Sequence, residues 1–351
     1  MTAIEELLPA LHRALSGRAE FDGIDFAALR PLPTTGLAHD HVVIDGTGAI
    51  LRVPRQSQMR LDAAGNLTYQ AACFERMGAG GHTPRFHGLL PPSSDLPMGA
   101  LIVDRIDGHV LDAPGELPRA ARALASIHAL PMPPPDARAP LIDQRNPMAD
   151  TLEEVLVQAQ FLEEAGPDPD SLSMIREELA NAARDVSNLG QPPVTLISFD
   201  AHPGNFLVDA TGRAFLVDLE KGRYGGAGFD LAHATLYTST TWDVATYSEP
   251  SADEVAEFYD AWRAAMPDEI ANRLEPFLKP MRRLMWLWSV TWCAKWRVES
   301  RKETLSEKQD AEVTEDWSAE NSDRSLIDHV RGRVDCYLSR EIVVRVRQDW
   351  A

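Results

Sequence analysis

Three side chains that carry oxygen atoms stand close together in one stretch of the sequence, residues 196–220 (LISFDAHPGNFLVDATGRAFLVDLE). Asp200 and Asn205 bracket a loop that contains proline and glycine, and Asp218 follows an apolar run. Carboxylate and amide oxygens are ligands that Mg²⁺ prefers, and a carboxylate also accepts a proton from a hydroxyl group. The set therefore suits phosphoryl transfer, in which a protein mainly positions the reactants and neutralises their charge.

The sequence also indicates how these side chains meet. Two apolar runs, 206–208 and 214–217, are separated by a glycine-containing turn, which predicts a β-hairpin. Because a hairpin returns its ends to one place, we expect Asn205 and Asp218 to be neighbours at its open end, with Asp200 just upstream. In this arrangement Asn205 and Asp218 bind the metal ion, and Asp200 is the catalytic base.

The same stretch resembles the catalytic core of the aminoglycoside phosphotransferase and choline kinase family. The resemblance lies in Asp200-Ala201-His202-Pro203-Gly204-Asn205, in Val217-Asp218-Leu219-Glu220 and in Phe229-Asp230-Leu231-Ala232. It implies a protein-kinase-like fold and a kinase that uses ATP and Mg²⁺ to phosphorylate a hydroxyl of a small molecule, such as an aminoglycoside, a choline-like amine, an amino alcohol or a sugar. It also implies that Asp230 braces the catalytic loop and does no chemistry.

The resemblance implies further residues of the nucleotide site. Thr34-Thr35-Gly36-Leu37 stands where a loop of the family lies over the nucleotide phosphates. Asp104 and Ile106 stand at the hinge, whose backbone groups hydrogen-bond adenine in such kinases. Arg52 takes the place of a phosphate-binding lysine, and Gln70 takes the place of the glutamate that pairs with it.

Arg52 and Gln70 depart from the family pattern, and so does Ser198, where the family commonly has a histidine. We interpret the first two as a coordinated change, in which Arg52 binds the phosphates and the carbonyl oxygen of Gln70 accepts one of its remaining donors. The alternative is that Arg52 is an ordinary surface residue of its strand. A further alternative for the whole chain is a kinase-fold protein that binds nucleotide without transferring phosphate.

A metallohydrolase is another function class to weigh. Asp200, His202, Asp218 and His233 would then form a cluster for a transition metal. Their order resembles no metal-binding motif, and a histidine beside proline and glycine is more typical of a residue that braces a loop.

The composition limits the compartment and the partners. The chain has 351 residues and a formal net charge of −19, which disfavours a nucleic acid partner and would favour a cationic substrate. No apolar run is long enough for a transmembrane helix, so no membrane partner is expected, and the acidic N-terminus differs from a signal peptide. Three scattered cysteines indicate a reducing compartment, so we expect a cytoplasmic protein. The sequence does not indicate an oligomeric state.

We expect an α+β protein with a two-lobed, protein-kinase-like fold. Residues 1–104 would form an N-terminal helix and a small nucleotide-binding lobe with an antiparallel sheet, and residues 105–351 a larger, mainly helical lobe with the substrate cleft. Helices are predicted at 3–16, 66–77, 117–128, 151–165, 170–188, 251–266, 268–300 and 326–338. The tryptophan-rich helix 268–300 is interpreted as a core element, with an aromatic wall for a cationic ligand as the alternative. His128 is expected to pack in the core.

Overall fold

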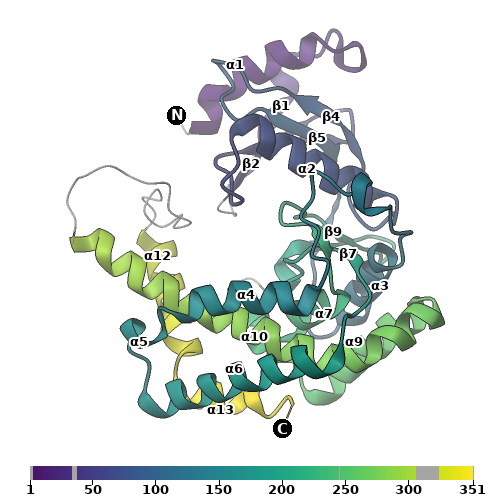
Figure 1. Ribbon diagram of the computed structural model, residues 1–351. Coiled ribbons are helices and arrows are strands. Elements are labelled where there is room, and N and C mark those ends of the chain that lie inside the picture. The colour runs from purple at the N-terminus through teal and green to yellow at the C-terminus, as the bar shows by residue number, and fades with distance from the viewer. Residues whose placement is uncertain (1–2, 34–37, 245, 306–323, 351) are drawn as a thin grey trace.

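The computed structural model describes residues 3–33, 38–244, 246–305 and 324–350. Figure 1 shows a lobe built around a sheet at the top and a larger helical lobe below it. The predicted α+β, kinase-like fold is confirmed. The loop that includes Gly36 lies outside the described residues, and the division of the chain at residue 104 stays a prediction.

The N-terminal lobe is built on a five-stranded antiparallel sheet. Its strands follow the order β1 (Leu29–Pro31), β2 (His39–Ile44), β3 (Ala49–Pro54), β5 (Ala100–Asp104) and β4 (Phe86–Leu90). Helix α1 (Ala3–Ser16) covers one face through Leu11 and Leu15, which are fully buried. Helix α2 (Ala63–Gly78) covers the other face, where Phe74 packs against β5.

The β2–β3 hairpin sets which side chains face the large lobe. The two strands pair antiparallel and are joined by a turn in which Gly46 and Gly48 have φ values of 81° and 71°. In this register His41 lies opposite Arg52. Because side chains alternate along a strand, His39 points to the same face as both of them.

The C-terminal lobe is mainly helical. Its helices are α3 (Leu117–His128), α4 (Pro147–Ala159), α5 (Leu162–Ala165), α6 (Pro169–Leu189), α7 (Ala227–Thr235), α8 (Tyr237–Thr240), α9 (Ala252–Ala265), α10 (Asp268–Leu305), α12 (Arg324–Tyr337) and α13 (Arg340–Arg347). The long helix α10 packs against α4, α6 and α7. Its Trp286 and Trp296 are buried, whereas Trp288 and Trp292 are half-buried, so the helix is a core element as predicted and also offers two rings at the edge of the core.

Helices α7, α8 and α13 of this lobe were not predicted. Helix α13 follows α12 and buries Ile342, Val343 and Val346. The predicted hairpin is confirmed as β8 (Phe206–Asp209) and β9 (Ala214–Leu216). Strand β6 (Gly108–Val110) extends it to a three-stranded sheet, and β7 (Thr195–Ile197) pairs with β10 (Arg223–Gly225) in a second small sheet; these three strands were not predicted.

Helix α2 joins the two lobes. The hydroxyl of Tyr69 donates to the carbonyl of Gly222 at 2.7 Å, and Cys73 lies beside the same carbonyl. The helix that covers the small sheet is therefore bonded to the segment that follows β9, which carries Asp218.

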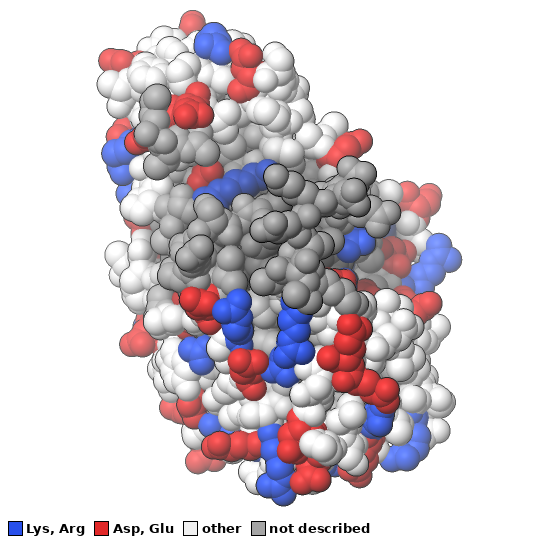
Figure 2. Space-filling model, turned by 90° about the vertical axis from the view of Figure 1, so that its left-hand side faces the viewer, with Lys and Arg blue, Asp and Glu red and all other residues white. Residues whose placement is uncertain are grey.

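Figure 2 shows Lys and Arg side chains interspersed with Asp and Glu on the described part of the face it draws. Within the described ranges, no helix is both long and apolar enough to cross a membrane.

Candidate active site

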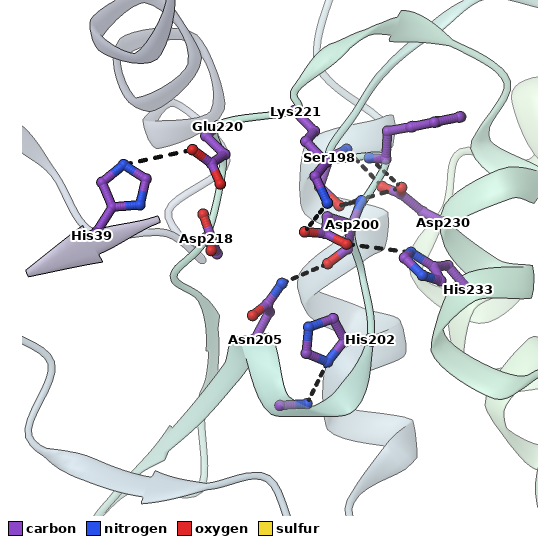
Figure 3. A network of polar contacts seen from close by, with 12 residues as sticks. His39, Ser198, Asp200, His202, Asn205, Asp218, Glu220, Lys221, Asp230 and His233 are labelled. Atoms are coloured by element: carbon purple, nitrogen blue, oxygen red, sulfur yellow. Dashed lines mark hydrogen bonds and ion pairs between the residues drawn. The ribbon is translucent and has the colours of Figure 1, made fainter. Parts of the chain in front are cut away.

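The hairpin brings the three predicted oxygen-bearing residues together. Strands β8 and β9 pair antiparallel, and the amide of Val217 donates to the carbonyl of Asn205 at 2.9 Å just beyond the paired residues. Asn205 and Asp218 therefore lie at the open end of the hairpin, with Asp200 beside them (Figure 3). Asn205 Nδ2 donates to the backbone carbonyl of Asp200 at 2.8 Å. This bond fixes the orientation of the Asn205 amide, and the side-chain oxygen of Asn205 takes no part in it.

Asp230 holds the start of the catalytic loop. Its carboxylate accepts from the backbone amides of Ser198 and Phe199, each at 2.8 Å, and from the Ser198 hydroxyl at 3.3 Å. Phe199 has φ of 57°, a conformation that a bulky residue rarely adopts and that needs support. His128 is buried as expected, and its Nε2 lies 3.2 Å from Asp230 Oδ2.

Asp200 is held by a lysine that the sequence analysis did not identify. Lys221 Nζ lies 2.9 Å from Asp200 Oδ2, and His233 Nδ1 lies 3.9 Å from Oδ1. Burial opposes ionisation of Asp200, but the charge of Lys221, followed by His202 and His233, holds its pKa below the usual value. Burial lowers the pKa of His233 to about 4, so its ring is neutral near pH 7.

The small lobe contributes Arg52, which is not a surface residue. Arg52 is 4% exposed, and its Nη2 donates to Asp218 Oδ1 at 2.5 Å. The guanidinium also lies 5.8 Å from the centre of the Phe74 ring. Its Nε–H is buried and has no hydrogen-bond partner among the described residues. A buried donor of this kind is suited to an anionic ligand.

Arg52 and Gln70 are linked through His39 and do not make the direct contact that was predicted. Arg52 Nη2 donates to His39 Nδ1 at 3.0 Å, and His39 Nε2 lies 3.1 Å from Gln70 Oε1. The amide of Gln70 faces Glu220 Oε2 at 3.5 Å. The expectation that the Gln70 carbonyl accepts from Arg52 is therefore wrong, because β2 places His39 between them.

The carboxylates after β9 differ in charge. Burial opposes ionisation of Asp218, but Arg52 and then His39 and Lys221 hold its pKa well below the usual value. Burial and the neighbouring charge of Asp218 raise the pKa of Glu220 to about 8, so that Glu220 carries a proton near pH 7.

The site contains two candidate sets of metal ligands. Among the described residues, the ligand atoms of His39, Asp218 and Glu220 lie within 4.8 Å of one another. Both nitrogens of His39 are engaged, however, and Mg²⁺ prefers oxygen ligands. Asp218 and Asn205 supply one carboxylate and one amide oxygen at the open end of the hairpin, which fits Mg²⁺.

The transition-metal cluster considered for a hydrolase does not form: in the part of the chain that the structure describes, the grouped ligand atoms belong to His39, Asp218 and Glu220, and His202 is not one of them. The Nδ1 of His202 accepts from the amide of Gly204 at 3.2 Å, which is the bracing role that the flanking proline and glycine indicate. The predicted hinge residues lie where the chain leaves the small sheet: Asp104 ends β5, and Ile106 lies in the connection to β6.

Sequence comparison decides the family of this chain. The profile of the phosphotransferase enzyme family (APH) matches residues 35–271, more than half of the chain. The protein belongs to this phosphotransferase family. A comparison with curated protein sequences gave no significant match.

Solved structures share the fold of this phosphotransferase. A choline/ethanolamine kinase family protein from Mesorhizobium loti aligns with a TM-score of 0.57 and 16% identity, over 97% of this chain and 99% of that chain. An ethanolamine kinase from Plasmodium vivax gives 0.60 and 12%, over 98% and 90%. The GDP complex of aminoglycoside 2'-phosphotransferase-IIIa gives 0.59 and 13%, over 94% and 98%. At such identities the likeness establishes the fold alone.

One side of the phosphotransferase site is formed by the large lobe. Phe199, the neighbour of Asp200, contacts the Trp288 ring edge-on with 5.6 Å between centroids. Trp288 Nε1 donates to Glu154 Oε2 at 3.2 Å, and Arg223 stacks over Phe199 at 3.8 Å while pairing with Glu154 at 3.3 Å. A carboxylate, a guanidinium and an indole thus adjoin the catalytic loop. Of these three groups, the sequence had indicated only the indole, through the tryptophan-rich helix 268–300.

Asp230→Ala should destabilise the phosphotransferase, because it leaves two buried amides of the catalytic loop without an acceptor. Each such loss costs about 1–3 kcal/mol, so we expect a decrease of roughly 3–5 kcal/mol in the free energy of unfolding in urea. Asp136→Ala, at an exposed site in the 135–137 turn, is the control and should stay within about 0.5 kcal/mol. An Asp230→Ala protein as stable as this control would refute the bracing role.

Proposed function

We propose that this phosphotransferase is an ATP- and Mg²⁺-dependent kinase that phosphorylates a hydroxyl group of a small molecule. One observation carries the proposal: Asp200, Asn205 and Asp218 meet at the end of the β8–β9 hairpin, opposite the buried guanidinium of Arg52. Phosphoryl transfer needs these four groups, namely a proton acceptor, two oxygen ligands and a fixed cation.

In this proposal each group has one task. The acceptor hydroxyl attacks the γ-phosphorus, the bond to the leaving ADP oxygen breaks, and the hydroxyl proton passes to Asp200. Lys221 and the Asn205 bond to the loop backbone hold Asp200 in place. Arg52 contacts the phosphates through its fork of donors.

Asn205 and Asp218 would hold the metal ion. Bound there, Mg²⁺ would neutralise charge on the phosphate oxygens. The low pKa of Asp218 keeps this carboxylate ionised at neutral pH, as a metal ligand must be. Adenine would reach the backbone of Asp104 and Ile106.

The acceptor would bind on the large-lobe side of Asp200. Glu154 is a partly exposed carboxylate there, and the Trp288 indole adjoins it, which supports an acceptor with a cationic amino group. Arg223 already balances part of this charge, so uncharged sugars and amino alcohols belong in the same screen as aminoglycosides and choline-like amines.

Asp200→Ala should abolish turnover and leave MgATP binding intact, because Asp200 acts on the acceptor and not on the nucleotide. General-base catalysis typically contributes a factor of about 10²–10⁴ to the rate, so kcat should decrease by a factor in this range. The measurement is coupled ADP detection on the best acceptor from the screen. A variant that keeps more than about a tenth of wild-type kcat would show that Asp200 is not the base.

MgATP should stabilise the wild-type protein against thermal unfolding, since ligand at about 100 times its Kd adds roughly 2.7 kcal/mol. Asp218→Ala should lose most of the part that depends on the metal. The comparison is between melting shifts with ATP plus Mg²⁺ and ATP plus EDTA, because the substitution also lowers the stability of the free protein by unpairing Arg52.

An unchanged wild-type melt with saturating ATP, GTP and Mg²⁺ would contradict nucleotide binding altogether. Stabilisation by MgATP without turnover on any acceptor would instead favour a nucleotide-binding protein that does not transfer phosphate.

A further inference from the structure

The segment before the small-lobe hairpin turn contains a residue that neither the sequence pattern nor the family match identifies. We propose that His39 is a positioning residue of the nucleotide site: together with Gln70 it holds the Arg52 guanidinium in the orientation that binds phosphate. The inference rests on the proposed function, since it takes the nucleotide phosphates as the ligand of Arg52.

The contacts of His39 fix its tautomer. An arginine side chain has donors only, so the 3.0 Å contact of Arg52 Nη2 requires His39 Nδ1 to accept. The proton of the neutral ring is then on Nε2, which donates to Gln70 Oε1 at 3.1 Å and also lies 3.5 Å from Glu220 Oε2 (Figure 3). The Gln70 amide is oriented in turn, because its Nε2 faces Glu220 Oε2 at 3.5 Å. Each group in this chain of bonds has one orientation.

Burial makes the chain of bonds rigid. His39 is 4% exposed and Gln70 is 1% exposed, so water offers neither of them a substitute partner. A buried polar group without a hydrogen-bond partner destabilises the protein by its full desolvation free energy. This cost favours the observed arrangement, in which each group has a partner. The Phe74 ring lies against another side of the guanidinium and restricts its movement there.

The neutrality of His39 and Gln70 explains why these residue types suit an arginine. The anion that pairs with Arg52 in the structure is Asp218, which the proposed function assigns to the metal ion. Nucleotide phosphates would replace Asp218 as the partner of the guanidinium, and His39 would still hold Nη2 during the exchange. A carboxylate in place of this neutral pair would compete with the phosphates for the same charge.

Calorimetric titration of MgATP into the full-length protein tests the role of His39. His39→Ala should weaken MgATP binding by roughly tenfold or more, the effect of one hydrogen bond from a charged donor. His39→Gln keeps one acceptor and one donor and should restore most of the affinity. In turnover assays the KM for ATP should rise more than kcat falls.

Gln70 should act through His39, and a double-mutant cycle reports this. Gln70→Ala alone should weaken MgATP binding by about two- to tenfold. In the His39→Ala background the same substitution should add little, because the link is already broken. If His39→Ala does not fold, the MgATP affinities of Gln70→Ala and His39→Gln test the inference in its place.

His12→Ala is the matched control in the same lobe. His12 belongs to α1, which covers the sheet face opposite to Arg52, and its Nε2 contacts the carbonyl of Ile24 at 2.9 Å. The substitution should therefore leave the affinity for MgATP unchanged. Wild-type binding together with unchanged affinity in His39→Ala, or fully additive effects of the two substitutions, would overturn the inference. A wild type that binds no MgATP would overturn the proposed function itself and the role of His39 with it.

Discussion

A buried guanidinium needs an anion, and the ion pair between Arg52 and Asp218 meets this need across the two lobes. Arg52 belongs to the small sheet, and Asp218 follows the hairpin of the large lobe. Removing one partner of such a buried pair typically costs 3–5 kcal/mol, because the remaining charge stays out of water. In the proposed function the nucleotide supplies a second anion at the same place, so that ligand binding exchanges one partner of Arg52 for another and releases Asp218 to the metal ion.

The rest of the site depends on groups that hold the functional oxygens and do no chemistry themselves. Asp230 supports the strained backbone at Phe199, and the backbone carbonyl of Asp200 holds the amide of Asn205, whose oxygen is a proposed metal ligand. Lys221 holds the carboxylate of Asp200 and keeps it ionised. Such positioning matters because phosphoryl transfer depends on placement and charge more than on covalent chemistry by the protein.

The parts of this arrangement that the sequence predicts are the local ones. Asn205 and Asp218 could be placed together because two apolar runs and a glycine-containing turn specify a hairpin over a short stretch. Lys221 and His39 could not be identified, because their partners are set by the path of the chain between distant elements: His39 is 31 residues from Gln70 in the sequence. For the same reason the departures at Arg52 and Gln70 suggested a direct contact, and only the register of β2 reveals the histidine between them.

A crystal structure with Mg²⁺ and a non-hydrolysable ATP analogue is the most direct test of this account. It should show the metal ion bound by Asp218 and Asn205, with Arg52 on the phosphates and still bonded to His39. The γ-phosphate should face Asp200. An analogue bound away from these residues, or Arg52 still paired with Asp218 while the nucleotide occupies the space between the lobes, would contradict it.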